Sequence, residues 1–385
     1  MLSQLPLEIL IKIINHLSFY DVLNLLKLKN YHVYSACRSL LNIKLTIKDR
    51  KSNLYKYLNA FDNPKILDVR DGNTDKNKLL KIINNKEWSL ERIVLNNTRT
   101  VFDQTWCQFF KKQQKIKEIT LYAPCELEGK HINQINRNLE VLKIRYHYLS
   151  FGDLLVLNDF PYLKDLDLSY GIRLYNKNLT KLKLTNLEKI NMTNTAVIFN
   201  EELYHFFREM KNLKNLHLDF NPFSFRTIEN VNDIFPNLEV FTYSNSITSF
   251  ETLNLKNYWY QLKHINFSYG MFDDRMFIDV INKAPNLEII NLDLTNITDL
   301  SVVHAVIKLK KLTKLNIARN KITNISGINI AYHCRNLKEL DISATKINTR
   351  VMKKIIENNK IDILTIMDCY NIKKRFLKDI KILIT

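Results

Sequence analysis

The sequence of 385 residues is poor in glycine and proline and has no long apolar run. Glycine and proline number only 6 and 7, and no linker rich in Ser, Pro or Gly appears, so a disordered chain is not expected. No stretch approaches the roughly 18 consecutive apolar residues of a membrane-spanning helix. Glu8 and Lys12 interrupt the apolar residues from Leu5 to Leu17, and we therefore expect no secretory signal.

Cysteine is scarce and irregularly spaced. The five cysteines include no Cys-x-x-Cys pair, which argues against a disulfide framework and against a zinc site; they are Cys37, Cys107, Cys125, Cys334 and Cys369. A reducing compartment fits this pattern, and we expect a cytoplasmic and/or nuclear protein. No Gly-rich phosphate loop, HExxH or G-x-S-x-G signature is present. The sequence therefore predicts no catalytic residue, no metal ligand and no cofactor.

Positive charge is in excess, because 57 Lys and Arg stand against 39 Asp and Glu, a net charge of +18. Such a charge is compatible with nucleic acid, acidic lipid or an acidic protein as partner. The cations form short clusters such as Lys310-Lys311 and Lys353-Lys354, which are typical of solvated helix faces. We therefore expect neither a membrane nor a nucleic acid as partner; a nucleic-acid binder would show steep salt dependence.

A phrase of the form Leu-x-x-Leu-x-Leu recurs about every 25 residues. The clearest copies begin at Leu213, Leu287, Leu312 and Leu337. Weaker copies begin at Pro64, Leu90, Ile116, Leu139, Leu163, Leu187, Leu238, Leu262 and Ile361. Alternating apolar positions within the phrase predict a strand, while the segments between phrases carry helical spacing. The repeating unit is therefore strand, turn, helix and turn.

The phrase resembles the leucine-rich repeat over roughly residues 64 to 370. The resemblance implies an α/β fold, a curved solenoid of about 13 repeats with a parallel concave sheet and with helices or turns on the convex face. One helical face comprises Leu203, Phe206, Phe207 and Met210, and Asp273, Asp299 and Asn348 are suited to cap helices. Strands about 4.8 Å apart make a surface that suits a protein or peptide better than a metabolite.

Residues 1 to 41 lie outside the repeat and predict three helices. Pro6 suits a first helical turn, and this head resembles an F-box at Leu5, Pro6, Glu8, Ile9, Ile13, Leu17, Asp21, Leu23, Leu25 and Leu28. It departs from the family at residues 28–32, where the usual tryptophan is missing. Tyr31, His32 or Tyr34 could fill that space, and whether such an F-box still binds an adaptor is open.

Four segments are predicted along the chain. They are a three-helix F-box at 1–41, a first strand and capping connection at 42–63, the repeat solenoid at 64–370 and a C-terminal capping tail at 371–385. Ile43, Leu45 and Ile47 alternate like a strand. We expect the apolar tail to cover the exposed edge of the final repeat, because terminal repeats need such protection.

The architecture resembles that of F-box/leucine-rich-repeat proteins, the substrate receptors of SCF-type cullin–RING ubiquitin ligases. The resemblance implies that the F-box docks on a Skp-family adaptor, that the repeats hold a protein substrate and that other subunits transfer ubiquitin. A helix face rich in leucine and isoleucine is compatible with such docking. The adaptor contacts implied are Leu5, Pro6, Ile9, Leu10, Ile13 and Leu17.

Two sets of residues are predicted to bind substrate, because side chains between the strand leucines alternate onto the concave face. A basic, tyrosine-rich patch suits an acidic or phosphorylated segment; it contains Tyr122, Lys143, Arg145 and Tyr146. A polar ladder suits a peptide backbone or a basic segment; it contains Asp167, Asn191, His217, Asp219, Asn266, Asn291, Asn316 and Asp341. For any single residue, a solvated strand face is the alternative.

Other functions stay open. A non-catalytic repeat scaffold or inhibitor would bind proteins without assembling a ligase, and alanine at Leu5 and Pro6 would then leave partner capture unchanged. A GTPase-activating repeat protein is the enzymatic alternative. The observed period of about 25 residues argues against it, because those proteins normally have longer repeats with fuller helices.

Overall fold

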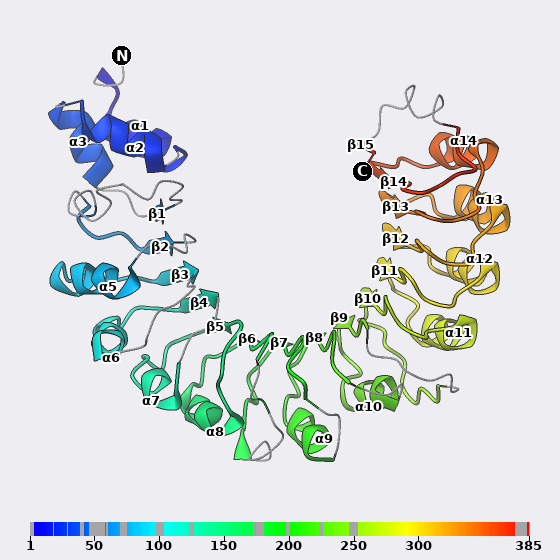
Figure 1. Ribbon diagram of the computed structural model, residues 1–385, viewed down its shortest axis with the longest axis horizontal. Coiled ribbons are helices and arrows are strands. Elements are labelled where there is room, and N and C mark those ends of the chain that lie inside the picture. The colour runs from blue at the N-terminus through cyan, green and yellow to red at the C-terminus, as the bar shows by residue number, and fades with distance from the viewer. Residues whose placement is uncertain are drawn as a thin grey trace. The chain divides into compact units, whose positions relative to one another are not determined.

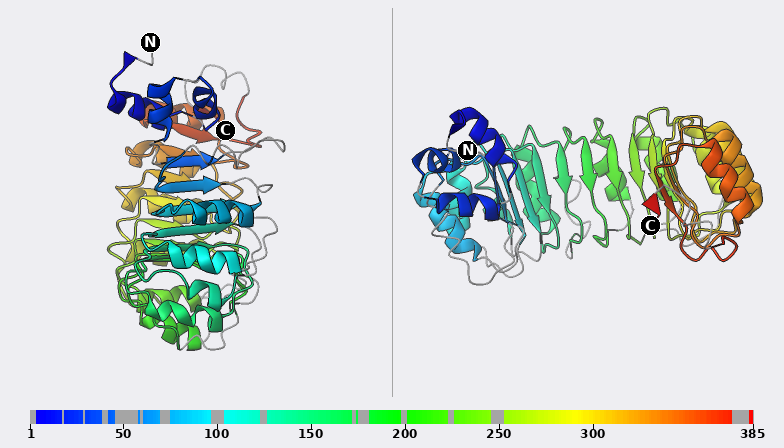
Figure 2. Two further views of the ribbon diagram at one scale, coloured as in Figure 1. Left: turned by 90° about the vertical axis from the view of Figure 1, so that its left-hand side faces the viewer. Right: turned by 90° about the horizontal axis from the view of Figure 1, so that it is seen from above.

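Two compact units, Met1–Leu187 and Glu188–Thr385, make up the chain in this computed structural model. The structure describes residues 4–17, 19–28, 30–38, 42–45, 58, 61–69, 75–96, 104–122, 127–171, 174, 181–197, 201–222, 226–245, 253–373 and 383–384. In each unit, helices lie along one face of a row of parallel strands (Figure 1, Figure 2). The opposite face of the strands is called the open face below. The four segments predicted from the sequence do not coincide with these units and stay predictions.

The first unit begins with three short helices, α1 (Leu7–Asn15), α2 (Phe19–Leu26) and α3 (Tyr31–Arg38). Pro6 precedes α1, where its missing N–H costs nothing. Helix α3 packs against both α1 and α2. The buried side chains between them include Leu10, Ile14, Val22, Val33 and Ala36. His32 ties α3 to the start of the chain through a 2.7 Å hydrogen bond from Nε2 to the Leu5 carbonyl.

Six strands of the first unit pair in parallel in sequence order. They are β1 (Asn42–Leu45), β2 (Ile66–Val69), β3 (Arg92–Asn96), β4 (Glu118–Tyr122), β5 (Val141–Ile144) and β6 (Asp165–Asp167). The connections carry α5 (Lys76–Asn85), α6 (Gln104–Lys112), α7 (Gly129–Ile132), α8 (Phe151–Leu154) and the 3₁₀ helix η2 (Leu155–Asp159). Strand β1 contains the predicted strand residues Ile43 and Leu45, and Ile47 lies outside the described residues.

Nine strands of the second unit also pair in parallel in sequence order. They are β7 (Lys189–Asn191), β8 (Asn215–His217), β9 (Val240–Thr242), β10 (His264–Asn266), β11 (Ile289–Asn291), β12 (Lys314–Asn316), β13 (Glu339–Asp341), β14 (Ile363–Thr365) and β15 (Leu383–Ile384). The helices are α9 (Glu201–Arg208), α10 (Arg226–Ile234), α11 (Asp274–Lys283), α12 (Asp299–Lys308), α13 (Asn324–His333) and α14 (Thr349–Asn358). Each of the thirteen predicted repeats contains one strand, β2 to β14, which confirms the predicted register.

Residues 383–384 form the last strand, β15, which pairs in parallel with β14. Most of the predicted capping tail, residues 374–382 and 385, lies outside the described residues.

The repeated apolar residues form the core between strands and helices. Leu287 and Leu292 are fully buried around β11, and Met276 and Phe277 are fully buried on α11. Burial of such side chains contributes about 1.5–3 kcal/mol each. The predicted cap Asp273 accepts a hydrogen bond from the Met276 amide at 3.0 Å, as an N-cap should.

One predicted cap is wrong, because Thr298 and not Asp299 precedes α12 and accepts the capping bond. Asp299 is the first residue of the helix and instead joins two repeats. Its carboxylate accepts hydrogen bonds from the Thr323 and Ser326 hydroxyls, each at 2.5 Å.

The turn after most strands contains a residue in the left-handed backbone region, and none of these residues is glycine. They are Tyr146, Tyr170, Asn194, Phe220, Asn245, Tyr269, Leu294, Arg319, Ala344 and Asp368. The amide of such a residue donates to a carbonyl of the next repeat, as in the 3.0 Å bond from Leu294 to Ala318. This bond offsets a conformation that costs an L-residue about 1–2 kcal/mol.

Acidic and basic residues alternate just before the strands. In the first unit the positions are Lys65, Glu91, Lys117, Glu140 and Lys164, and in the second they are Glu188, Lys214, Glu239, Lys263, Glu288, Thr313, Lys338 and Asp362. Neighbouring charges form ion pairs, such as Lys117–Glu140 at 2.8 Å and Lys214–Glu188 at 2.9 Å. We call this arrangement the charge ladder; Thr313 interrupts it.

Candidate binding surfaces

An apolar stripe lies on the exposed face of α1 and its C-terminal turn. Ile9, Ile13 and Leu17 are 43%, 38% and 37% exposed, and their spacing of four residues places them one above the other on a helix. Pro6 is also exposed at the start of the helix. We call these four residues the α1 stripe. They are four of the six predicted adaptor contacts.

The other two predicted adaptor contacts are less accessible. Leu10 is completely buried between the helices, so its place is in the bundle core, and Leu5 is half-buried. Of the residues that could fill the space of the missing tryptophan, Tyr31 is 86% exposed and His32 is half-buried against the Leu5 carbonyl. Leu28, 60% exposed, adds a large apolar side chain to this end of the unit.

The predicted basic patch of the first unit is electrically balanced. Lys143 Nζ lies 3.0 Å from a carboxylate oxygen of Asp165, and Arg145 Nη2 lies 2.8 Å from one of Asp167. These two pairings were not predicted from the sequence; both carboxylates lie on the neighbouring strand β6, each two residues before the register position of its cation. Because each cation has a carboxylate of its own, the patch has little capacity to attract an anionic segment.

Aromatic rings surround this balanced cluster. The Arg145 guanidinium lies 5.2 Å from the centre of the Tyr122 ring, and Tyr146 stacks on Tyr170 with 4.5 Å between ring centres. Tyr146 is 45% exposed. The structure therefore brings together all four residues of the predicted patch, as an aromatic and not a cationic surface. Asp167 is only 3% exposed beneath it.

The recurring Asn and Asp residues of the polar ladder shape the turns that follow the strands. In six of them, all except Asp219, a side-chain oxygen accepts a hydrogen bond from the amide two residues later, an Asx turn. The pairs are Asp167–Ser169, Asn191–Thr193, Asn266–Ser268, Asn291–Asp293, Asn316–Ala318 and Asp341–Ser343. The Nδ2 groups of Asn266, Asn291 and Asn316 have no hydrogen-bond partner among the described residues, which leaves a row of donors on the open face.

His217 and Asp219 of the ladder share one hydrogen-bond chain. The Thr242 hydroxyl donates to Asp219 at 2.5 Å and lies 2.9 Å from His217 Nδ1, and the Ser244 amide also donates to Asp219. The hydroxyl hydrogen is already committed to Asp219, so His217 Nδ1 carries a proton and donates. Burial lowers the pKa of nearby His264. These contacts order the side chains on the open face.

Large exposed side chains occupy the left-handed turn positions of the second unit. Phe220, Tyr269 and Leu294 are 47%, 41% and 46% exposed. The Arg319 guanidinium donates to the Tyr269 hydroxyl at 2.6 Å and also pairs with Asp293. We call Phe220, Tyr269, Leu294 and Arg319 the rim. None of the four belongs to the residues predicted to bind substrate, and the signal in the sequence that identifies them is their shared position three residues after the strand end.

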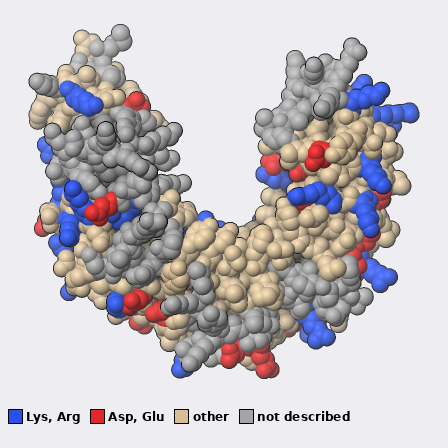
Figure 3. All heavy atoms as spheres, in the orientation of Figure 1, with Lys and Arg blue, Asp and Glu red and all other residues tan. Residues whose placement is uncertain are grey.

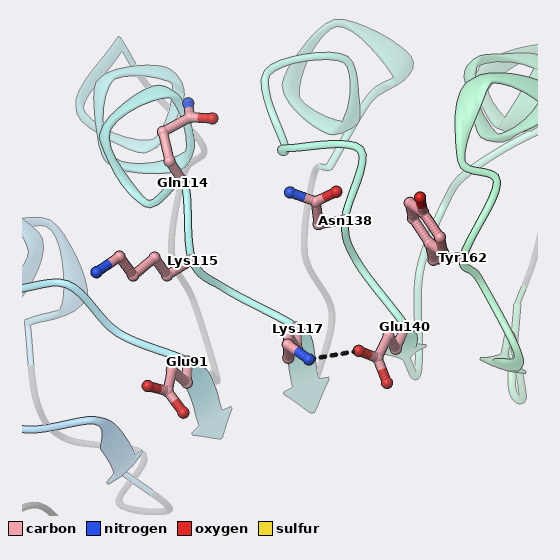
Figure 4. A pocket seen from close by; sticks show the side chains of 7 residues that line it. All are labelled: Glu91, Gln114, Lys115, Lys117, Asn138, Glu140 and Tyr162. Atoms are coloured by element: carbon pink, nitrogen blue, oxygen red, sulfur yellow. Dashed lines mark hydrogen bonds and ion pairs between the residues drawn. The ribbon is translucent and has the colours of Figure 1, made fainter.

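Two grooves lie along the edge of the charge ladder, one in each unit. The first-unit edge groove has a volume of about 460 Å³; it is lined by Glu91, Gln114, Lys115, Lys117, Asn138, Glu140 and Tyr162. Figure 4 shows Lys117 directed at Glu140 across it. The second-unit edge groove has a volume of about 650 Å³; it is lined by Glu288, Lys311, Thr313, Arg335, Asn336, Leu337, Lys338, Asn358 and Lys360.

Comparison with known proteins supports the fold. No protein-family model matches this chain, and no curated protein matches its sequence. Among solved structures, the Rad7–Elc1 complex in yeast has a TM-score of 0.56 at 11% identity, with 99% of this chain and 91% of that chain covered. The mouse RP105/MD-1 complex has a TM-score of 0.54 at 16% identity, with 82% and 61% covered. An internalin from Listeria monocytogenes has a TM-score of 0.43 at 16% identity, with 73% and 88% covered.

The likenesses to the Rad7–Elc1 and RP105/MD-1 structures concern the fold, which is that of a leucine-rich-repeat solenoid. Within the described ranges, no helix is long and apolar enough to cross a membrane. The same residues contain no group of three His, Cys, Asp or Glu that could hold a metal ion.

Proposed function

We propose that this chain is the substrate-recognition subunit of an SCF-type E3 ubiquitin ligase. The three N-terminal helices dock on a Skp-family adaptor, which links the chain to a cullin–RING ligase, and the open face of the repeats holds a protein substrate. The chain itself binds and does not catalyse, because ubiquitin transfer belongs to other subunits. The observation that carries the proposal is the α1 stripe, together with the repeats that follow it.

The α1 stripe has the chemistry of a helix that enters an apolar groove. Ile9, Ile13 and Leu17 keep more than a third of their surface in water although α1 already has a buried face in Leu10 and Ile14. Fully burying an aliphatic side chain contributes about 1.5–3 kcal/mol. A partner groove that covered the stripe would therefore gain affinity without disturbing the bundle core. The likeness to Rad7, solved with Elc1 and covering 99% of this chain, also supports a protein partner.

The open face of the second unit suits an extended protein segment. The rim offers apolar and aromatic contacts, while the Nδ2 groups of Asn266, Asn291 and Asn316 can donate to backbone carbonyls. Strained residues tend to occur where side chains have a function. Phe220, Tyr269 and Leu294 lie at left-handed turns where glycine would cost less conformational energy. In this proposal, these positions carry large side chains because the side chains contact the substrate.

The proposal is tested by affinity capture of the full chain from an extract that contains the ligase subunits, followed by mass spectrometry. The wild type is expected to capture adaptor and cullin, and the double variant Ile9→Glu with Ile13→Glu is expected to lose both, because charges cannot enter an apolar groove. Leu300→Glu is a matched control, since Leu300 is an apolar helix residue, 66% exposed, in the other unit. Adaptor capture unchanged by the double variant would overturn the proposed docking.

A repeat scaffold or inhibitor without ligase assembly is the second candidate. The missing tryptophan and the exposed Tyr31 favour it, because both differ from the usual adaptor-binding head. This candidate predicts that the wild type captures a substrate-like partner but neither adaptor nor cullin.

A further inference from the structure

The two edge grooves occupy the same place in the repeat but carry different charges. Ladder positions Glu91, Lys117 and Glu140 line the first-unit edge groove, and Glu288, Thr313 and Lys338 line the second. These three positions are acidic, basic and acidic in the first-unit edge groove, and acidic, neutral and basic in the second-unit edge groove.

The charges of the lining residues add up differently in the two grooves. In the first-unit edge groove, two cations face two carboxylates and the sum is zero; they are Lys115, Lys117, Glu91 and Glu140. In the second-unit edge groove, four cations face one carboxylate and the sum is +3; they are Lys311, Arg335, Lys338, Lys360 and Glu288. Lysine and arginine side chains also gather over α11 to α14 of the same unit in Figure 3. The field in the second groove therefore favours anions.

The cations of the second-unit edge groove are weakly neutralised. Lys338 has only a long contact of 3.6 Å with Asp362. Lys311 and Lys360 have no ion-pair partner among the described residues, and Arg335 Nη1 donates to the Asn358 carbonyl at 3.0 Å. That bond holds one side of the guanidinium in place and leaves its remaining donors for a ligand. Lys117 of the first groove, by contrast, pairs with Glu140 at 2.8 Å.

We propose that the second-unit edge groove binds a phosphorylated segment of a protein partner. The planar guanidinium of Arg335 can donate two parallel hydrogen bonds to a phosphate, and the ammonium groups add point charges around it. None of the described residues that line the groove has an aromatic side chain on which a nucleic-acid base could stack, which favours a peptide. This assignment rests on the proposed function for the identity of the partner, and what it adds is the place on the second unit where the phosphate would be held.

Binding to the groove is tested on the purified full chain without adaptor, by calorimetry at low salt. The probes are inorganic pyrophosphate, a doubly phosphorylated peptide that is otherwise uncharged, the same peptide with glutamate in place of each phosphoresidue, and a single-stranded oligonucleotide of equal charge. The wild type is expected to bind pyrophosphate in the millimolar range and the phosphopeptide more tightly. The glutamate peptide should bind at least about tenfold more weakly, because carboxylates carry less charge and fewer acceptor oxygens.

Two exposed double variants separate the groove from general charge. Arg335→Gln with Lys360→Gln should weaken phosphopeptide binding at least about tenfold, a loss of about 1.4 kcal/mol. Lys115→Gln with Lys117→Gln removes the same charge from the first-unit edge groove and should change affinity less than about threefold. Equal losses in the two variants, tighter binding of the oligonucleotide, or no binding of either phosphate probe would each overturn the site. Because no adaptor is present, these failures are distinct from failure of adaptor docking.

Discussion

At the residue scale, His147 is a histidine that folding keeps neutral. The Leu149 amide donates to its Nδ1 at 3.1 Å, so Nε2 carries the proton and donates to the Leu168 carbonyl at 3.0 Å. The ring also explains Gly171, because a Cβ atom there would lie 2.6 Å from His147 Cε1. Burial lowers the pKa of His147 to about 4. The ring is therefore part of the fold and is no candidate for a base.

The stability of the chain should depend on pH through this ring. Because the pKa of His147 is lower in the folded chain than the ordinary value of 6.5, the unfolded chain binds more protons between about pH 6.5 and 4. Stability is then fully present above this window and is lost as pH falls through it, by about 2 kcal/mol at pH 5. Denaturant titrations at pH 7 and pH 5 measure the loss. His147→Gln should be less stable at pH 7 but lose about 2 kcal/mol less on acidification; an equal acid loss in both proteins would contradict this role.

The left-handed turns give a second prediction at the residue scale. Ala344 is exposed and has φ 53°, a region that glycine enters without steric cost. Ala344→Gly should leave the free energy of unfolding unchanged or raise it by up to about 1 kcal/mol, after the entropy of the more flexible unfolded chain is subtracted. Ala331→Gly, at a buried position within α13, should instead lower it by about 1 kcal/mol or more. Thermal unfolding of the two variants and the wild type measures these changes. A lower stability of Ala344→Gly than of the wild type would contradict the proposed backbone strain at Ala344.

At the element scale, the charge ladder places oppositely charged side chains beside each other at the starts of neighbouring strands. Like charges opposite each other are destabilising in a sheet, and the alternation avoids them. Glu239 stands between Lys214 and Lys263, and its carboxylate lies 3.2 Å from the latter. A strand shifted by one repeat would meet the wrong sign, so the ladder also favours the correct register.

Reversal of one ladder charge tests this role. Glu239→Lys places three cations in a row and should lower the free energy of unfolding by about 1 kcal/mol relative to Glu239→Gln, which only removes the attraction. The difference should shrink in about 1 M salt, because screening shortens the range of surface charges. Denaturant titrations at low and high salt provide the comparison, and a difference that salt does not change would show that the charges are not responsible.

The sequence predicts strands and register well because both depend on apolar spacing within about 25 residues. The spacing of Leu287, Ile290 and Leu292, all buried, predicts strand β11 and its buried face from neighbouring residues alone. Prediction from the sequence fails where packing between neighbouring elements determines which residue is buried or which charges pair. Ile9 and Leu10 are adjacent and equally apolar, yet only packing against α3 determines which one is buried. The Lys143–Asp165 pair joins two repeats, so the charge of that surface could not be judged from one repeat alone.

At the scale of the whole molecule, the proposed function assigns different surfaces to different partners. The α1 stripe belongs to the first unit, whereas the rim and the positively charged edge groove belong to the second. A chain that brings a substrate to a ligase needs this division, because adaptor and substrate must be bound at the same time. Substitutions in one unit should therefore leave binding at the other unit unchanged.

The docking of α1 on a Skp-family adaptor is tested most directly by titration calorimetry with the purified adaptor and the purified full chain. We predict a complex with a dissociation constant in the micromolar range or tighter. Ile9→Glu with Ile13→Glu should weaken it at least about 100-fold, and Leu300→Glu should change it less than about threefold. Circular dichroism of each variant verifies that the helices are retained. No measurable binding of the wild type, or equal affinity of all three proteins, would contradict the proposed docking.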